Sequence, residues 1–281
     1  METSLNVQVL SYTPDFEQNI VRGAKLCYSS SDIGSLKEKV IPEEAKRFLN
    51  MILKIGHGSI LEHSSITFGI EGISRSLSHQ LVRHRIGCSY SQKSQRYVLE
   101  GDFNYIVPQE IKNNSFAYER FIKSMEEINN AYIEIQEALF ENYIINANED
   151  LKSLYENNYD INKLDKLINT FIKNNPNLVN SLKKKAAENA RAVLPNACET
   201  KIQVTMNVRA LFNFFKERLC NRAQDEIREM AYQMWLECMK ISPTIFQFAV
   251  PTCVNGKCKE GNMTCGKANE VKEKFKNNIN K

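Results

Sequence analysis

One group of arginines stands beside short polar side chains, a combination suited to an anionic ligand. Arg83, Arg85 and Arg96 flank residues 89–94, which are rich in serine and glutamine. Arginine presents a planar fork that pairs with two oxygens of a phosphate at once. Lysine is otherwise the commoner basic residue, with 25 copies against 12 arginines. The segment therefore predicts a site for a phosphorylated ligand, with solvated salt bridges as the alternative.

A second polar group lies near the carboxyl-terminal third of the chain. Asn207 precedes Arg209 and Asn213, and the last two are four residues apart, so they share one face of a helix. Arg218 follows Arg209 by nine residues, which is half a turn out of phase on a continuous helix. We therefore expect either a helix break between these arginines, or an Arg218 that serves another ligand or a neighbouring subunit.

All four histidines lie between residues 57 and 84, which raises the question of a metal site. Their spacings of 6, 16 and 5 do not give the i, i+4 pair that faces one metal ion from a helix. We predict no metal site there. His63 is interpreted as a core histidine paired with Glu62 or with the backbone.

The last 31 residues differ from the rest of the chain in charge and in cysteine spacing. Residues 251–281 hold seven lysines and three acidic residues, whereas residues 1–250 hold 30 basic and 30 acidic side chains. Within this tail, Cys253, Cys258 and Cys265 supply three thiols, one short of a zinc site. A metal site completed from elsewhere, a redox role and unreactive reduced thiols all stay open.

Composition excludes several classes of protein. With 281 residues, 42% hydrophobic and 25% charged, the chain is expected to fold. The neutral body argues against a broad nucleic-acid surface, and no G-x-G-x-x-G motif indicates a Rossmann dinucleotide site. No apolar run is long enough for a membrane span, and no export signal is recognised. Eight cysteines without such a signal predict reduced thiols in a cytoplasmic protein.

These residues must be positioned by a mixture of strands and helices. Apolar alternation predicts strands over residues 5–10, 64–70 and 202–208. Helical periodicity predicts helices over residues 43–55, 73–85, 121–143, 150–187 and 209–240. The fourth is expected to contain a turn at 174–177. The fifth is expected to break near 218–221, with a new N-cap at Asn221. Residues 86–95 and the tail are predicted to lack regular structure. The fold expected is α+β, mainly an antiparallel sheet packed with long helices.

Four sequence blocks, in order, resemble the flavin-dependent thymidylate synthases over about residues 5–250. The most specific is Arg83-His84-Arg85 with the downstream Ser94-Gln-Arg96-Tyr97, similar to that family's Arg-His-Arg and Ser-x-Arg-Tyr signature. Eight residues separate Arg85 from Ser94, where seven are common. The other blocks are Gly56-His57-Gly-Ser59-Ile-Leu-Glu62-His63, Ala190-Arg191-Ala-Val-Leu-Pro195, and Asn207-Val-Arg209-Ala-Leu-Phe-Asn213 continuing through Arg218 to Ala223-Gln224-Asp-Glu226-Ile227.

The resemblance implies a reaction and a set of ligands. The family makes dTMP by reductive methylation of dUMP, with 5,10-methylenetetrahydrofolate as carbon donor and NADPH as the source of a hydride carried by FAD. Arg218 is implied as the catalytic residue, contacting the uracil edge. The residues implied for dUMP are Gln80, Arg83, Gln92, Ser94, Arg96, Arg191 and Arg218. Those implied for FAD are His57, Ser59, Arg83, His84, Arg85, Asn207, Arg209 and Asn213.

The resemblance also implies a homotetramer whose active sites draw on several subunits, with no membrane or nucleic-acid partner. The domain layout expected is one domain over residues 1–250, with a helical insertion at about 145–185, and a basic cysteine-containing tail over 251–281. The absence of a Pro-Cys-His nucleophile agrees with flavin chemistry. The alternative is a non-catalytic nucleotide- or RNA-binding protein that uses the same arginines and serines, and bound flavin would distinguish the two.

Overall fold

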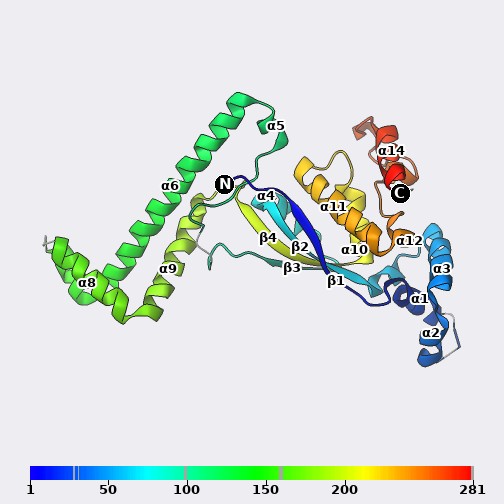
Figure 1. Cartoon of the computed structure of the whole chain (residues 1–281), viewed down its shortest axis with the longest axis horizontal. Helices are drawn as coiled ribbons and strands as arrows, with labels where there is room; N and C mark the ends of the chain where they lie inside the picture. The colour runs from blue at the N-terminus through cyan, green and yellow to red at the C-terminus, as the bar shows by residue number, and fades with distance from the viewer. Residues whose placement is uncertain (28, 31, 98–99, 158–160, 280–281) are drawn as a thin grey trace. The chain divides into compact units, whose positions relative to one another are not determined.

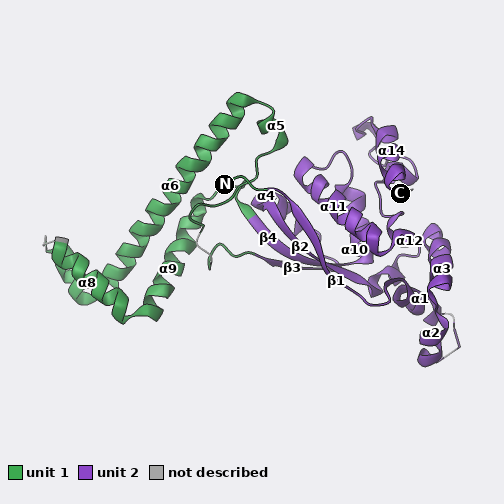
Figure 2. Cartoon of the chain, in the orientation of Figure 1, with its two compact units in different colours: residues 1–3, 93–199 green, residues 4–92, 200–281 purple. Residues whose placement is uncertain are grey.

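The computed structural model describes residues 1–27, 29–30, 32–97, 100–157 and 161–279. Contacts within the chain divide it into two compact units (Figure 2). One unit comprises residues 1–3 and 93–199, and the other comprises residues 4–92 and 200–281. They are called the helical unit and the sheet unit below, after their main content.

The sheet unit is built on four strands in the order β1-β2-β4-β3 (Figure 1). Their bounds are β1 Asn6–Tyr12, β2 Ser65–Ser74, β3 Cys88–Gln92 and β4 Glu199–Asn207. β1 pairs antiparallel with β2, and β3 pairs antiparallel with β4. The hydroxyls of Thr67 and Thr205 lie 2.9 Å apart, and the Val208 amide donates to the Ser64 carbonyl. The start of β2 therefore lies beside the end of β4, so this central pair is antiparallel as well.

The sheet unit also carries most of the shorter helices. Their bounds are α1 Phe16–Leu26, α2 Ile33–Lys39, α3 Pro42–Ile55, η1 Ser59–His63, α4 Arg75–Leu81, α10 Val208–Arg218, α11 Asp225–Ile241, α12 Pro243–Phe246, α13 Thr252–Asn255, η3 Gly261–Met263 and α14 Ala268–Ile279. α11 packs against β1, α4 and α10, and α10 packs against η1. The predicted end of α3 is confirmed, because Gly56 adopts φ 86°, the left-handed conformation of a C-terminal cap.

The core of the sheet unit is aromatic. Trp235, Phe214, Phe215 and Phe246 are fully buried, together with Phe68 of β2. The Trp235 indole donates a 3.0 Å hydrogen bond to the Phe246 carbonyl, so its polar atom is satisfied inside the core. This core holds α10 and α11 firmly beneath the residues that line the site described below.

The carboxyl-terminal tail is ordered, so the prediction of irregular structure after residue 250 is wrong. α14 buries Val271 and Phe275 against α11, where the Phe275 ring meets Trp235 edge-on at 5.0 Å. The sequence contains the necessary pair, since Val271 and Phe275 are four residues apart on one helical face. Because lysines occupy other positions of the segment, this short apolar face is hard to recognise in the sequence.

The helical unit consists of α5 Gln109–Lys112, α6 Ser115–Asn146, α7 Glu149–Glu156, α8 Ile161–Asn174, α9 Pro176–Ala190 and η2 Arg191–Val193. α6 runs alongside α9, and α7 and α8 follow at one end of α6 (Figure 1). The predicted turn at 174–177 is confirmed, because α8 ends at Asn174 and Pro176 opens α9. Residues 158–160 of the predicted helical stretch lie outside the described residues.

The α+β prediction is confirmed, whereas three local predictions need correction. The segment at residues 86–95 contains strand β3, because it pairs with β4 along its length. The helix predicted over 73–85 stops at Leu81, which leaves Arg83, His84 and Arg85 outside it. The break after Arg218 is confirmed, but the side chain that caps α11 belongs to Gln224, which accepts from the Ile227 amide, and not to Asn221.

Candidate functional site

A cavity of about 760 Å³ in the sheet unit collects many of the residues singled out in the sequence. We call it the arginine pocket, and its lining is Glu62, Arg83, His84, Arg85, Ile86, Cys88, Asn207, Arg209, Ala210, Asn213, Glu217 and Arg218. Its volume is within the range of small-molecule sites. Four guanidinium groups and two side-chain amides give it a strongly cationic, donor-rich wall.

The turn after α4 presents the arginine–histidine–arginine motif. Val82 caps α4, and the chain then turns through Gly87, whose φ of 71° is in the left-handed region. The Tyr90 hydroxyl of β3 donates to the His84 carbonyl at 2.6 Å and lies 3.1 Å from the Leu81 carbonyl. This tyrosine fastens the turn to the sheet, and sequence analysis missed its role.

His84 and Arg218 are joined by a hydrogen bond inside the pocket. The Arg218 Nε–H donates to His84 Nε2 at 3.0 Å, so that imidazole nitrogen carries a lone pair. Burial lowers the pKa of His84, and the positive charge of Arg218 lowers it further, while Glu217 acts in the opposite sense. The Phe214 ring meets His84 edge-on at 5.1 Å. A neutral, fixed imidazole therefore orients the guanidinium of Arg218.

Arg209 and Arg218 reach the same pocket from one uninterrupted helix, α10. The helix break, the first of the two alternatives, is therefore wrong, and the second alternative, that Arg218 serves another ligand or a neighbouring subunit, stays a prediction. Arg209 lies at the first turn of α10 and Arg218 at its last residue, where the long side chain folds back towards His84. The prediction that Arg209 and Asn213 share one helix face is confirmed, because both are exposed and line the pocket, while Leu211 and Phe215 are buried.

The start of α10 is built by Asn207 and its neighbours. The Asn207 side-chain oxygen caps the helix by accepting from the Ala210 amide at 2.8 Å. The backbone amide of Asn207 donates to the Gly87 carbonyl. A Cβ at Gly87 would lie 2.5 Å from the Asn207 side-chain nitrogen. Arg209 is paired with Glu62 of η1. Asn207 thus has a structural function in addition to lining the pocket.

The histidine-rich block lies beside the pocket, with a different pairing from the one predicted. His57 and Ser59 are exposed and are not part of the pocket lining. A Cβ at the intervening Gly58 would lie 3.8 Å from Arg209 Nε, so this loop borders the pocket. His63 is exposed, with its ring against Gly23, so its interpretation as a core histidine is wrong.

Two residues implied for dUMP lie elsewhere in the sheet unit. Gln80 is half-buried on α4. Gln92, at the end of β3, donates to the hydroxyls of Ser78 at 2.9 Å and Thr200 at 3.1 Å. Both of those hydroxyls belong to the protein's own framework. The structure therefore shows Gln92 in a bridging role between α4 and β4.

The remaining residues implied for dUMP gather in the helical unit around Glu188 of α9. The Arg96 guanidinium lies 3.5 Å from the Glu188 carboxylate, and Arg191 Nε donates to the Glu188 carbonyl at 3.2 Å. Ser94 Oγ accepts from the Arg96 amide at 3.2 Å. The segment of Ser94 and Arg96 therefore lies close to Arg191, about 95 residues later in the chain, and the two arginines form a local cationic cluster.

Other residues of the matched blocks are structural. Glu226, at the start of α11, accepts hydrogen bonds of 2.7 Å from both the amide and the hydroxyl of Ser74, the residue that caps α4. Arg228 pairs with Asp225, and Arg222 pairs with Glu260. A carboxylate at the start of a helix is an ordinary sequence feature, so nothing in the sequence revealed the partner of Glu226.

The described residues contain neither a preformed metal-binding group nor a helix that could span a membrane. Across the described ranges, no group of three or more His, Cys, Asp or Glu side chains is already arranged to hold a metal ion. Among the helices whose residues the structure describes, none combines the length and apolarity needed to cross a bilayer.

The chain matches known proteins along most of its length. Residues 8–244 match the family described as "Thymidylate synthase complementing protein". The chain is 44% identical over 269 residues to a flavin-dependent thymidylate synthase of Clostridium tetani, covering 96% of each protein. It is 42% identical over 274 residues to a flavin-dependent thymidylate synthase of Geobacter sulfurreducens, covering 97% of this chain and 98% of the relative.

A solved structure shares the fold. The UMP/dUMP methylase PolB of Streptomyces cacaoi, bound with 5-Br dUMP, superposes with a TM-score of 0.63 at 19% identity, covering 88% of this chain and 95% of that one. At this identity the likeness concerns the fold alone. The match over residues 8–244 and the two relatives above 40% identity confirm the resemblance noted in the sequence, and the chain belongs to the thymidylate synthase complementing protein family, that of the flavin-dependent thymidylate synthases.

Proposed function

We propose that this protein is a flavin-dependent thymidylate synthase, an enzyme that methylates dUMP to dTMP. Family membership supports the activity, and the arginine pocket is the observation that carries it to specific residues. The pocket collects Arg83, His84, Arg85, Asn207, Arg209 and Asn213, six of the eight residues implied for FAD.

The pocket fits the chemistry of FAD. Guanidinium groups suit the two phosphates of a dinucleotide, and the amides of Asn207 and Asn213 suit its hydrogen-bonding edges. We assign the flavin to this pocket, with His57 and Ser59 on the loop that borders it. FAD, when bound, supplies the hydride for the reduction of the transferred carbon. The protein's part is to bind, orient and exclude solvent.

We propose that Gln80, Arg83, Ser94, Arg96 and Arg191, contributed by more than one subunit of the proposed tetramer, bind dUMP, with the arginines at its phosphate. Arg96 is paired with the Glu188 carboxylate, a group that carries one negative charge. A phosphate near neutral pH carries up to two, so it competes favourably for this guanidinium. Gln92 is assigned to the same ligand as a residue that supports the site, since its amide joins α4 to β4.

We assign to Arg218 the stabilisation of negative charge that develops on the uracil ring when its carbon becomes nucleophilic. The hydrogen bond from its Nε to His84 fixes the plane of the guanidinium. The terminal nitrogens of that plane would contact the uracil edge. A single donor placed in advance where charge develops contributes roughly 3 kcal/mol to lowering a barrier.

The other parts of the proposal extend beyond the pocket. We propose NADPH as the source of the hydride, 5,10-methylenetetrahydrofolate as the carbon donor, and a homotetramer as the active assembly. A cytoplasmic location is supported by the cysteines, since all eight are free thiols. We also propose that about residues 145–185 are an insertion into the catalytic domain.

The experiment that tests the function is dTMP formation, measured by HPLC. Purified protein is incubated with dUMP, methylenetetrahydrofolate, NADPH and FAD, and each component is omitted in turn. We expect dTMP in the complete mixture alone. Protein that is folded and flavin-loaded yet makes no dTMP would overturn the proposal. Size-exclusion chromatography with light scattering tests the tetramer separately.

A further inference from the structure

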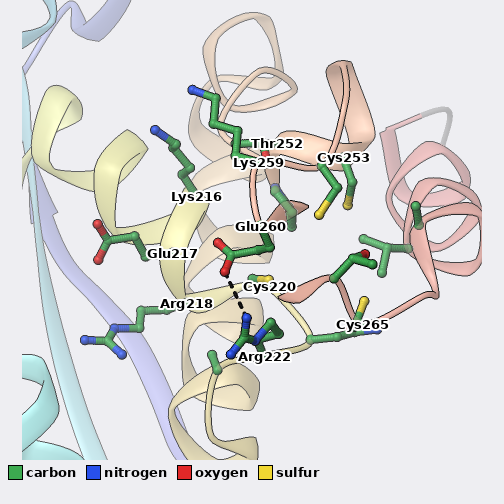
Figure 3. Close-up of a pocket in the computed structure, with 17 residues that line it drawn as sticks. Lys216, Glu217, Arg218, Cys220, Arg222, Thr252, Cys253, Lys259, Glu260 and Cys265 are labelled. Atoms are coloured by element: carbon green, nitrogen blue, oxygen red, sulfur yellow. Dashed lines mark hydrogen bonds and ion pairs between the residues drawn. The ribbon is translucent and has the colours of Figure 1, made fainter. Parts of the chain in front are cut away.

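A second cavity of the sheet unit, about 480 Å³ in volume, is lined by four cysteines. We call it the cysteine pocket, after Cys220, Cys253, Cys258 and Cys265. Figure 3 shows Cys220, Cys253 and Cys265 around one space, between the end of α10 and the carboxyl-terminal segment, and Cys258 lines the same cavity. The proposed reaction uses none of these thiols, and half of the chain's eight cysteines gather here.

The fold, and not the local sequence, brings the fourth thiol to the other three. Cys253 lies on α13, and Cys258 and Cys265 lie on the loop that follows it. Cys220 lies just after α10, 33 residues before Cys253. Arg222 joins the two segments, because its guanidinium contacts the Glu260 carboxylate at 3.2 Å and the Met263 carbonyl at 2.7 Å. α14 is anchored to α11 beyond this loop.

We propose that Cys220, Cys253, Cys258 and Cys265 together bind one thiophilic metal centre, a Zn²⁺ ion or an iron–sulfur cluster. Four thiolates are the ligand set that both centres share. The four-residue gap between Cys253 and Cys258 is within the range of structural zinc sites. Binding converts four thiols to thiolates and releases their protons to solvent.

The charges around the cysteine pocket favour such a centre. Four thiolates around Zn²⁺ carry a net charge of about −2. The lining includes Lys216, Arg218, Arg222 and Lys259, against the carboxylates of Glu217 and Glu260. The excess of cationic side chains in this lining would offset the charge of the centre.

Metal binding requires a small local closure. Among the described residues, no three ligand side chains already stand at metal-binding separation. Gly261, in the loop between Cys258 and Cys265, and Gly266, just after Cys265, both have positive φ. The backbone of this loop therefore makes tight turns. Rotation of four short side chains towards the shared space would complete the site. Structural zinc sites commonly form together with the fold around them.

The centre would stabilise the end of α10. Arg218 and Glu217 line both the cysteine pocket and the arginine pocket. In Figure 3 the Arg218 side chain points away from the cysteines, so the centre would act on its backbone and not on its guanidinium. We therefore infer a structural role, in which the metal fixes the helix end that presents Arg218.

The test is metal analysis of the full-length protein, prepared without a metal-affinity tag and handled under argon. We expect about one zinc per chain, or iron with acid-labile sulfide in matching amounts. Inductively coupled plasma mass spectrometry measures both metals, and sulfide analysis distinguishes the two centres. The variant Cys258→Ser/Cys265→Ser should lose the metal, whereas Cys27→Ser, which changes an exposed cysteine, should retain it.

A second measurement uses the unaltered protein and does not depend on how a variant folds. In the native protein, iodoacetamide should label Cys27 and spare the four cysteines of the pocket. Removal of metal by a chelator should then make Cys258 and Cys265 reactive. Protein without stoichiometric zinc or iron, or with a Cys253–Cys258 disulfide in peptide maps, would overturn the proposal.

Discussion

The arginine pocket follows α10 from Asn207 to Arg218, whereas the cysteine pocket begins at the carboxyl-terminal end of that helix, and the two differ in how far the sequence reveals them. The ligand-facing residues of the arginine pocket come from short blocks, such as residues 83–85 and 207–213. The cysteine pocket needs Cys220 as well as the tail, two segments joined by tertiary packing. Packing assembles both pockets, but the blocks of the arginine pocket match a family signature, whereas nothing in the sequence links Cys220 to the cysteines of the tail.

The largest effect expected is on catalysis, from removing the residue that lines both pockets. Arg218→Ala should lower kcat for dTMP formation at least tenfold, and by about 10²–10³-fold if the guanidinium stabilises the developing charge alone. The KM for dUMP should change far less. Steady-state assays with HPLC detection measure both constants.

A matched control removes an arginine outside both pockets. Arg120 is exposed on α6 and pairs with Glu127. Arg120→Ala should leave kcat unchanged. Equal losses in the two variants would contradict a catalytic role for Arg218. A normal far-ultraviolet circular dichroism spectrum and normal flavin content are required of each variant before the rates are compared.

The contrast between the two pockets also applies to the fold, where some elements could be predicted from the sequence and others could not. Periodicity predicted β1, β2, β4 and the long helices, because each buries an apolar face. β3 was missed because Cys88–Gln92 is small and polar, and its strand form depends on pairing with β4. The early end of α4 was also missed, since the Tyr90 hydroxyl that holds the turn lies on β3, a strand that the sequence did not predict.

The site could be predicted as a set of residues but not as an arrangement. The blocks indicated Arg83, His84, Arg209 and Arg218 without showing that Arg218 is bonded to His84. They also could not separate ligand-binding residues from framework residues. Asn207 caps a helix, and Glu226 fastens one helix to another, because their partners are brought close only by the fold.

The next largest effect tests the framework that supports both pockets. Glu226 follows the turn that lines the cysteine pocket, and it accepts from Ser74 at the start of α4, the helix before Arg83. Glu226→Ala would leave two donors without this acceptor. We expect the free energy of unfolding to fall by about 2–3 kcal/mol, measured by urea denaturation. Glu229→Ala, an exposed change on the same helix, should alter it by less than about 0.5 kcal/mol.

A smaller effect is expected at the glycine beneath the arginine pocket. Gly87→Ala would place a Cβ 2.5 Å from the Asn207 side chain at a φ of 71°. We expect a loss of about 1–2 kcal/mol in stability, together with weaker FAD binding in a flavin fluorescence titration. Gly101→Ala is the control, because a Cβ there would meet no described atom within 4 Å. Unchanged flavin affinity in Gly87→Ala would separate this turn from the flavin site.

The smallest effect concerns the proton on His84. Burial and Arg218 lower its pKa in the folded protein, so between the folded and unfolded pKa values the unfolded chain binds more protons. Stability is therefore highest above the unfolded pKa and falls as the pH drops below about 6.5. Protonation would also remove the lone pair that accepts from Arg218 Nε.

Urea denaturation of the flavin-free protein at several pH values between 7.5 and 5.5 measures this dependence. His84→Asn should show a shallower loss of stability than the unaltered protein, because the titrating group is gone. His79→Asn, which changes an exposed histidine on α4, should retain the original slope. Identical slopes in all three proteins would show that His84 is protonated alike in both states. In that case the hydrogen bond to Arg218 would not set the charge of His84, and the edge-on contact with Phe214 would be what holds the imidazole in place.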